Sequence, residues 1–395
     1  MNKKLKIGVI GAGGRGRLAH LAHKPEEGVE LIAGVDMNKK VLEEFKEKFP
    51  DSFVSTDYRE LLKIKDIDAV FVTTPDFLHE EHALAAIEAG KAVYLEKPMT
   101  ITIDGCDKIL KRAKEKNVKI YVGHNMRHFS TITMMRNLIN SGVIGDVKAG
   151  WCRHFVAYGG DAYFKDWHAE RAKSTGLLLQ KGAHDIDVLH WLCGGYTKRV
   201  VAFGGLTLYD KIKDRHSPEE RGDASFRIEN WPPLTQKQLN PIIDVEDISM
   251  MLMELDNGVF CSYQQCHYTP DGWRNYTIIG THGRIENFGD GPGDSVIKVW
   301  HQRSGYNPYG DIQYFVPPAS GSHGGSDPSI VDEFIRFVRD DTQIRISPVE
   351  ARNSVAAGYM ATMSLRDRGT PMDIPPVPQE IIDYYNRFVI KKQSN

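Results

Sequence analysis

A glycine-rich segment near the start of the chain has the spacing needed to hold a dinucleotide. Gly11-Ala12-Gly13-Gly14-Arg15-Gly16 follows a short β-type run, and Asp36 ends the next such run 20 residues after Gly16. The first glycine permits a tight turn, the second lets the backbone approach a pyrophosphate, and the third allows close packing of a helix on a strand. The free N–H groups at a helix start attract phosphate. We therefore expect all six loop residues and Asp36 to bind a dinucleotide.

Asp36 also bears on the choice of cofactor. A carboxylate at this position accepts hydrogen bonds from the adenosine ribose diol and repels a 2′-phosphate. Lys39 and Lys40 follow closely and partly offset that repulsion. NAD is therefore the predicted cofactor, and NADP is the less favoured one.

The first third of the chain alternates between two kinds of segment. Apolar β-type runs at 5–10, 29–36, 69–74, 92–97 and 119–124 are separated by helical patterns. Runs without polar alternation indicate strands that are covered on both faces, as in a parallel sheet with crossover helices. This pattern predicts an α/β domain over residues 1–125.

The rest of the chain has a different rhythm. Strand-like segments follow one another without intervening helices, and Asp256-Asn257-Gly258 is a hairpin signal. We expect an α+β domain over residues 126–395 with the C-terminal helices attached, one of which begins at the capping box Ser347-Pro348-Val349-Glu350. Residues 211–241 are charged and contain prolines. They form either a lid over the site or a surface insertion.

Composition excludes several classes of partner. Lys+Arg is 50 and Asp+Glu is 52, for a net charge of −2, so there is no general attraction for nucleic acid or an acidic membrane. The N-terminal apolar run is too short for a signal peptide, and no segment approaches the roughly 18 apolar residues that span a bilayer. We expect a cytoplasmic protein. Its five scattered cysteines suit reduced thiols. Cys261, Cys266, His267 and His282 lack a metal-ligand spacing, so no metal is expected.

Several further motifs carry a family resemblance. They are TTPDFLH at 73–79, EKP at 96–98, GHNMR at 123–127 and GLLLQKGAHDIDVLHWL at 176–192. Together with the glycine loop they resemble the Gfo/Idh/MocA family of sugar and inositol dehydrogenases, over nearly the whole chain. The resemblance implies a Rossmann domain followed by a domain with an open, mainly antiparallel sheet. It also implies an NAD-dependent oxidoreductase of a sugar, cyclitol or polyol, assembled as a homodimer or homotetramer.

The resemblance assigns roles to residues of the first domain. It places Lys97 beside the nicotinamide and a substrate hydroxyl, and Glu96 near the nicotinamide ribose. Lys97 also lies at the carboxyl end of a predicted parallel strand, where open α/β sheets bind ligands. A lysine close to the positive ring would have a lowered pKa, which helps it to polarise a hydroxyl. Further cofactor contacts are expected from Thr73, Thr74, Pro75 and His79.

The second domain departs from the family pattern at one position. Family dehydrogenases commonly carry D-x-x-x-H-x-x-D, and Gln180 stands here at the first carboxylate, while His184 and Asp187 are retained. Glutamine cannot take a proton, so proton removal falls to His184 or Lys97, with His184 as the expected base, oriented by Asp187. The residues expected to bind substrate are Arg127, Trp167, Arg171, Gln180, Lys181 and Asp187.

Two other functions remain open. A redox-neutral glycosidase or lyase that oxidises its substrate transiently is compatible with Gln180. A non-catalytic NAD-binding regulatory protein is disfavoured by the retention of Lys97 and His184. Strand alternation places Tyr263, Gln265 and His267 on one face, which meets either substrate or a partner subunit.

Overall fold

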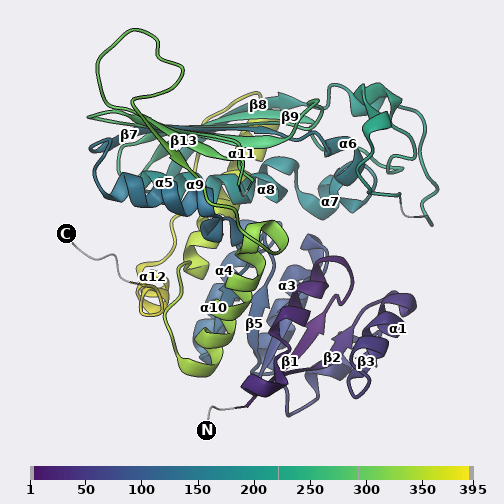
Figure 1. Ribbon diagram of the computed structural model, residues 1–395. Helices are drawn as coiled ribbons and strands as arrows, with labels where there is room; N and C mark the ends of the chain where they lie inside the picture. Colours follow the sequence, from purple (N-terminus) through teal and green to yellow (C-terminus); the bar gives the residue numbers. More distant parts are fainter. Residues whose placement is uncertain (1–3, 221, 292, 391–395) are drawn as a thin grey trace. The chain divides into compact units, whose positions relative to one another are not determined.

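The computed structural model describes residues 4–220, 222–291 and 293–390 (Figure 1). The chain forms two units. The first comprises the described residues of Met1–Asn125, Gly321–Arg352 and Val377–Asn395, and the second comprises those of Met126–Ser320 and Asn353–Pro376.

The first unit is built on a parallel sheet of six strands in the order β3-β2-β1-β4-β5-β6. This order reverses between β1 and β4, which is where open α/β sheets bind ligands at the carboxyl ends of their strands. The predicted parallel α/β domain is thus confirmed. The strands are β1 (Leu5–Ile10), β2 (Val29–Val35), β3 (Phe53–Ser55), β4 (Ala69–Val72), β5 (Ala92–Leu95) and β6 (Ile120–Val122).

Helices pack on this sheet from both early and late parts of the chain. In Figure 1, the yellow-green α10 and the yellow α12 belong with the purple and blue elements of this unit. The α-helices are α1 (Lys39–Lys48), α2 (Tyr58–Leu62), α3 (His79–Glu88), α4 (Ile103–Lys116), α10 (Ser326–Asp340) and α12 (Gln379–Asn386). The 3₁₀ helices are η1 (Gly14–Ala22), η2 (Pro25–Glu27), η3 (Asp76–Leu78) and η9 (Ser322–Gly325). A further 3₁₀ helix, η4 (Asn125–His128), begins at the last residue of the first segment and continues into the second unit.

The structure places two of the C-terminal helices, α10 and α12, in the first unit instead of the second, whereas most of α11 belongs to the second unit as expected. The apolar face of α10 enters the core of the first unit, where the Phe334 ring lies 5.3 Å from Phe71 and 5.6 Å from Tyr94, centroid to centroid. The phenol of Tyr121 donates a hydrogen bond of 2.7 Å to Glu333. A sequence pattern shows that a helix has an apolar face, but not which core that face joins.

The second unit contains a nine-stranded sheet in the order β14-β13-β12-β11-β7-β10-β9-β8-β15. Among the described strands of this sheet, only β7 and β10 pair in parallel. Asp256-Asn257-Gly258 forms the predicted hairpin between β9 and β10. The mainly antiparallel sheet is thus confirmed. The strands are β7 (Val147–Phe155), β8 (Thr197–Gly205), β9 (Ile248–Leu255), β10 (Phe260–Cys266), β11 (Trp273–Gly280), β12 (Arg284–Phe288), β13 (Val296–Trp300), β14 (Ile312–Phe315) and β15 (Met372–Asp373).

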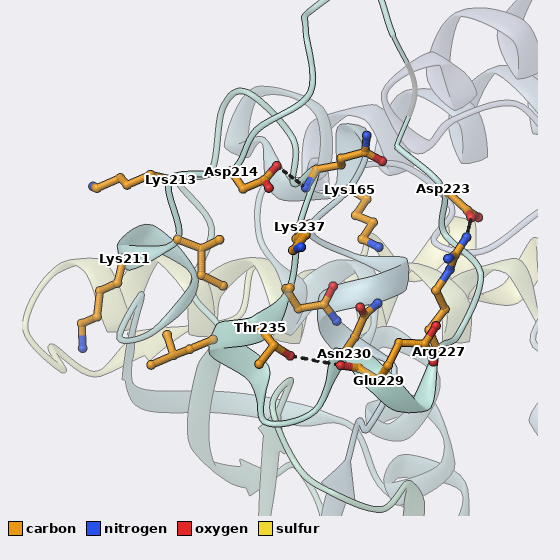
Figure 2. Close-up of a pocket in the computed structure, with 14 residues that line it drawn as sticks. Lys165, Lys211, Lys213, Asp214, Asp223, Arg227, Glu229, Asn230, Thr235 and Lys237 are labelled. Carbon is orange, nitrogen blue, oxygen red and sulfur yellow. Dashed lines mark hydrogen bonds and ion pairs between the residues drawn. The ribbon is translucent and has the colours of Figure 1, made fainter.

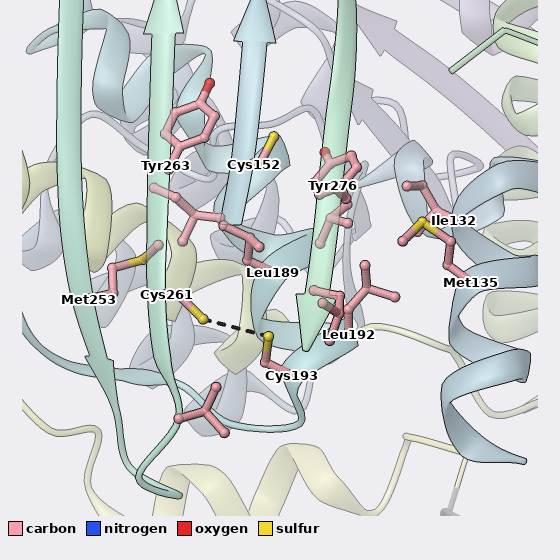
Figure 3. Close-up of a cluster of buried hydrophobic side chains, with 14 of the residues drawn as sticks. Ile132, Met135, Cys152, Leu189, Leu192, Cys193, Met253, Cys261, Tyr263 and Tyr276 are labelled. Atoms are coloured by element: carbon pink, nitrogen blue, oxygen red, sulfur yellow. Dashed lines mark hydrogen bonds between the residues drawn. The ribbon is translucent and has the colours of Figure 1, made fainter. Parts of the chain in front are cut away.

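Helices cover one face of this sheet. The core includes Ile132 and Met135 of α5 and Leu189 and Leu192 of α9 against strand residues such as Tyr276 (Figure 3). The α-helices are α5 (Ser130–Asn140), α6 (Gly159–Ala162), α7 (Arg171–Ser174), α8 (Leu177–Gln180), α9 (Gly182–Cys193) and α11 (Pro348–Arg366). Of these, α11 runs from the first unit into the second. The 3₁₀ helices are η5 (Trp167–Ala169), η6 (Tyr209–Lys211), η7 (Ile228–Asn230) and η8 (Pro233–Thr235).

Two local predictions are confirmed in the same way. The Ser347 N–H donates to Glu350 at 3.1 Å and the Ser347 hydroxyl accepts from the Val349 N–H at 3.2 Å, so the capping box forms at the start of α11. The five cysteines are free thiols, and the sulfurs of Cys193 and Cys261 lie 3.6 Å apart in the core (Figure 3).

Candidate functional site: a dinucleotide cradle and a buried polar cluster

The glycine loop follows β1 and leads directly into η1. Gly11 has a φ of 87°, and a Cβ there would lie 2.9 Å from the Thr74 nitrogen and 3.0 Å from the Thr73 carbonyl group. A Cβ on Gly16 would lie only 1.9 Å from the Gly11 carbonyl oxygen. Glycine is therefore required at both positions, at the first by conformation and at both by space. Gly14, with a φ of 48°, has no heavy atom within 4 Å of the place where its Cβ would be.

Asp36 lies at the end of β2 against this loop. One carboxylate oxygen accepts a hydrogen bond of 2.9 Å from the Gly13 N–H, and the other accepts one of 2.9 Å from the Asn38 N–H. The loop and the acidic residue predicted from their spacing are thus in direct contact.

The segment after β4 packs beneath the same loop. The Thr73 hydroxyl donates to the Gly11 carbonyl oxygen at 2.8 Å. The two ring nitrogens of His79 lie 2.8 Å from the carbonyl oxygens of Thr74 and Pro98. These contacts join the predicted cofactor residues after β4 to the segment after β5. Pro75, also a predicted cofactor residue, directly precedes η3.

Glu96 and Lys97 follow β5, and the Lys97–Pro98 peptide bond is cis. Glu96 is buried, and its carboxylate accepts hydrogen bonds from the Arg15 side chain at 2.6 Å and from the Lys97 N–H at 2.9 Å. Arg15 also forms a bidentate pair with Asp327 of α10, at 2.7 and 2.9 Å. The glycine loop, the EKP segment and α10 are therefore held together by one guanidinium.

Asp327 is a residue that sequence reasoning missed. Burial acts to raise its pKa, but hydrogen bonds from His323 and Arg15 outweigh burial and hold it well below the usual range. Asn125 donates to the same carboxylate at 3.1 Å. Because Asp327 is 312 residues from Arg15, no local spacing could have indicated the pair.

This arrangement fits a dinucleotide. The loop presents backbone without side chains at Gly11, Gly14 and Gly16, and space is open above Gly14, as close approach by a pyrophosphate requires. Asp36 directly follows the neighbouring strand β2, at the position where a carboxylate would accept hydrogen bonds from a ribose diol. The Glu96 and Lys97 pair follows β5 at the same edge of the sheet.

In the second unit, the HDID segment begins α9. Lys181 is the N-cap residue, and Gln180 ends α8 in a buried position. Both carboxylate oxygens of Asp187 accept hydrogen bonds from Arg127, at 2.9 and 2.7 Å, and each residue is 1% exposed. The Arg127 guanidinium also lies 5.4 Å from the centre of the Trp191 ring. Arg127 and Asp187 therefore form a buried ion pair within this unit, and their predicted contact with substrate stays a prediction.

Asp185, which sequence reasoning also missed, is the centre of a buried polar cluster. It is fully buried and accepts hydrogen bonds from His154 and Tyr263, each at 2.9 Å, and from the Tyr276 hydroxyl. The Nε of Arg274 lies 2.9 Å from the same carboxylate. Burial acts to raise the pKa of Asp185, but these neighbours outweigh it and the pKa is lowered. Burial lowers the pKa of His154 to about 3, so its ring is neutral at physiological pH.

Sequence alternation gave only part of this cluster. Tyr263, Gln265 and His267 share the buried face of the β10 segment, as predicted, and Tyr263 and Gln265 are joined by a 3.1 Å hydrogen bond. The partners of Asp185 come from β7, β10 and β11, which are brought together only by sheet pairing. The buried face of these strands therefore meets the start of α9.

Trp167 and Arg171 lie on the segment between β7 and α8. The Trp167 ring stacks on His168 with centroids 3.7 Å apart. Arg171 donates to Glu246 at 3.1 Å, and Arg366 pairs with the same carboxylate at 2.8 Å. Their predicted contacts with substrate stay predictions.

Residues 211–241 pack on this same segment. The Asn240 N–H of the excursion donates a hydrogen bond of 2.7 Å to the Phe164 carbonyl oxygen. A cavity of about 1140 Å³ lies between the excursion and Lys165, and Figure 2 shows Lys237, Asn230 and Arg227 on its wall. The described residues of the excursion thus form a wall of this cavity in the second unit. The role of the excursion as a lid stays a prediction.

Lys97 and His184 belong to different units, and each is partly exposed within the chain. The described residues contain no cluster of three or more His, Cys, Asp or Glu side chains suited to a metal ion. None of the helices in the described part of the chain combines the length and apolar character needed to cross a membrane.

Comparison with known sequences decides the family. The model of the oxidoreductase family with an NAD-binding Rossmann fold matches residues 5–124, and the model of its C-terminal alpha/beta domain matches residues 136–374. The chain belongs to the Gfo/Idh/MocA family. The resemblance carried by the motifs is therefore confirmed.

Individual relatives of this Gfo/Idh/MocA protein have differing activities. The 2,7-anhydro-N-acetylneuraminate hydratase of Mediterraneibacter gnavus is 31% identical over 211 residues, which are 51% of this chain and 53% of the relative. The scyllo-inositol 2-dehydrogenase (NADP(+)) IolW of Bacillus subtilis is 34% identical over 206 residues, which are 50% of this chain and 54% of the relative. The chain thus spans about half the length of each.

Among solved structures, a levoglucosan dehydrogenase in complex with NADH and levoglucosan has a TM-score of 0.77. It is 19% identical and the match covers 95% of this chain and 100% of that one. This similarity shows the fold of the Gfo/Idh/MocA dehydrogenases over both units.

Proposed function

We propose that this protein is an NAD-dependent oxidoreductase that oxidises a secondary hydroxyl of a sugar, cyclitol or related polyol, or reduces the matching ketone. The observation that carries the proposal is the joining of the glycine loop to the Glu96-Lys97 pair through Arg15. Lys97 directly follows Glu96 after β5, at the edge of the parallel sheet where open α/β folds bind their ligands. The inositol and levoglucosan dehydrogenases among its relatives agree with a polyol substrate.

The residues of the chain divide the work as follows. The nicotinamide, when bound, supplies the hydride chemistry. Lys97 holds and polarises the substrate hydroxyl oxygen, and a base of the second unit removes the proton. His184, which the family motif retains, is the first candidate for that base. Gln180 serves as a neutral hydrogen-bonding group in the same motif.

The test is a survey of polyols with purified enzyme. NAD with the right polyol raises the absorbance of reduced nicotinamide, and Lys97→Ala abolishes the rise, whereas Lys111→Ala on the exposed face of α4 does not. Tight NAD binding with no turnover on any substrate would instead favour the regulatory alternative.

NAD is the proposed cofactor in preference to NADP. Asp36 supports this choice because its carboxylate lies against the loop that would hold the pyrophosphate. A 2′-phosphate at this place meets a negative charge. One relative is an NADP(+)-dependent dehydrogenase, so the preference must be measured directly. We expect a higher kcat/KM with NAD than with NADP.

A second candidate is redox-neutral chemistry through transient oxidation. It is favoured by Gln180 in place of a carboxylate and by the hydratase among the relatives. Product formed with catalytic NAD and without net NADH would select this candidate over the simple dehydrogenase.

We also propose that the protein is a homodimer or homotetramer that associates through the open face of the nine-stranded sheet. Leu252 of β9 is 61% exposed and Phe260 of β10 is 65% exposed, and Phe203 of β8 and Met250 of β9 are exposed as well. An apolar patch of this kind marks an interaction surface. Sedimentation of the wild type and of Leu252→Glu tests it: the wild type sediments as an oligomer and the variant as a monomer.

A further inference from the structure

A lysine and two tyrosines form a compact group beside the start of α9. The Lys181 nitrogen lies 5.4 Å from the centre of the Tyr158 ring and 5.5 Å from that of Tyr163. Both phenols therefore lie in the field of this ammonium group. The segment that carries the tyrosines is held by the excursion, since the Asn240 N–H donates a hydrogen bond of 2.7 Å to the Phe164 carbonyl oxygen.

Lys181 has no carboxylate partner. No ion pair joins it to an Asp or Glu anywhere in residues 4–220, 222–291 or 293–390. The nearby carboxylate of Asp185 is engaged by Arg274, His154, Tyr263 and Tyr276. A buried ammonium without a counter-charge is costly, so the two neighbouring phenols are the groups that compensate it.

The three side chains differ in their access to solvent. Lys181 is 7% exposed and Tyr163 is 8% exposed, whereas Tyr158 is partly exposed. A small molecule therefore reaches Tyr158 first, with Lys181 behind it. Lys181 lies three residues before His184 on the helix start, so the pair stands beside the family's catalytic motif.

We infer that Tyr158 is the group that receives the proton of the substrate hydroxyl, and that Lys181 is the positioning residue that holds its phenolate oxygen. The inference rests on the proposed oxidoreductase function. The O–H bond of the substrate breaks, its proton goes to the Tyr158 oxygen, and its electron pair forms the carbonyl bond. The hydride of the same carbon leaves to NAD. Tyr158 and Lys181 together thus supply the base that Gln180 cannot supply.

The surrounding charges agree with this role. Burial acts to raise the pKa of Tyr158, and the positive charges of Lys181 and Arg274 outweigh burial and the opposing charge of Asp185, so the pKa is lowered. The pKa of Tyr163, by contrast, is raised, chiefly by burial. The nearby His267 and His154 have lowered pKa values because of burial and add no positive charge. Tyr158 is therefore the phenol of the pair that gives up its proton more readily.

The first experiment needs no substrate. Titration of the full-length protein, followed by the ultraviolet absorbance of tyrosinate, is expected to show one tyrosine that ionises below the others. Tyr158→Phe removes this early step, Lys181→Met moves it to higher pH, and Tyr163→Phe retains it. Absence of the early step in the wild type, or its persistence in Tyr158→Phe, overturns the inference whether or not a substrate is known.

The second experiment uses the polyol found for the wild type. Tyr158→Phe is expected to lower kcat by about 100-fold or more, as for loss of a general base, with NADH affinity retained. The rate falls as pH falls below the pKa of the base. Lys181→Met removes the positive charge that lowers this pKa, so the fall in rate moves to higher pH. Lys181→Arg keeps the charge and moves it less. The loss in Tyr163→Phe is much smaller.

The outcomes separate this inference from the proposed function. The inference is wrong, and His184 is the base, if two results are found together. Tyr158→Phe keeps a kcat near that of the wild type, and His184→Asn no longer shows the fall in rate at low pH. If no polyol is oxidised by the wild type, the proposed function fails, and the titration still decides the state of Tyr158.

Discussion

Replacement of Asp185 by asparagine tests the polar cluster of the second unit. Asp185 is fully buried, and its carboxylate is the counter-charge of Arg274, whose side chain is 13% exposed. Asparagine keeps the size and one acceptor oxygen but removes the charge. Arg274 is then left with Asp290, at 3.1 Å.

The loss of the ion pair with Arg274 sets the size of the expected destabilisation. Removing one partner of a buried pair costs about 3–5 kcal/mol, because the other charge stays buried. The hydroxyls of Tyr263 and Tyr276 can rotate to accept from the new amide, so their hydrogen bonds add little to this cost. We expect a destabilisation of the second unit of about 3–5 kcal/mol.

Tryptophan fluorescence during urea unfolding is the assay. All six tryptophans lie between Trp151 and Trp300, so the signal reports the second unit alone. The control is Asp373→Asn in the same unit, which breaks only the exposed pair with Arg199 and is expected to change nothing measurable.

The pH dependence has a definite sign. The folded pKa of Asp185 is lowered, so its contribution to stability is present at neutral pH and is lost as pH falls below about 4, the pKa of an unfolded aspartate. The gap in stability between wild type and Asp185→Asn should therefore narrow on acidification. A difference at neutral pH below about 1 kcal/mol would refute the reading of Asp185 as the counter-charge of Arg274.

Three further predictions concern the nucleotide unit. Gly16→Ala puts a Cβ 1.9 Å from the Gly11 oxygen and should weaken NADH binding by at least about tenfold in a fluorescence titration, as expected when a loop must shift. Asp36→Ala should lower the ratio of kcat/KM for NAD to that for NADP, because the carboxylate no longer repels a 2′-phosphate; an unchanged ratio would contradict the role of Asp36. Asp327→Asn should weaken NADH binding, because Arg15 loses its charged bidentate partner. The wild-type contribution of Asp327 is present at neutral pH and lost as pH falls below about 4, since its folded pKa is lowered, so wild type and variant should converge in acid.

The parts of the site that the sequence predicted are those built by neighbours along the chain. The glycine loop and Asp36 lie within one strand-helix-strand unit, so their spacing alone implies contact. The capping box at Ser347 is equally local. The partners of Asp185 could not be found in this way, because they lie on three strands whose order follows from pairing across the sheet. Tyr158 had no signal of its own, since its meaning depends on the position of Lys181.

The membership of α10 in the first unit could not be predicted for the same physical reason, and it has a functional consequence. The rings of Phe71, Tyr94 and Tyr121 line β4, β5 and β6, and Phe334 of α10 covers them from a distant part of the sequence. The first turn of the same helix contains Asp327, which holds Arg15 of the glycine loop. Because one helix both completes the core and fixes the side chain that reaches Glu96, the dinucleotide unit cannot be the first 125 residues alone. Its nucleotide cradle depends on a helix that the chain adds more than 300 residues later.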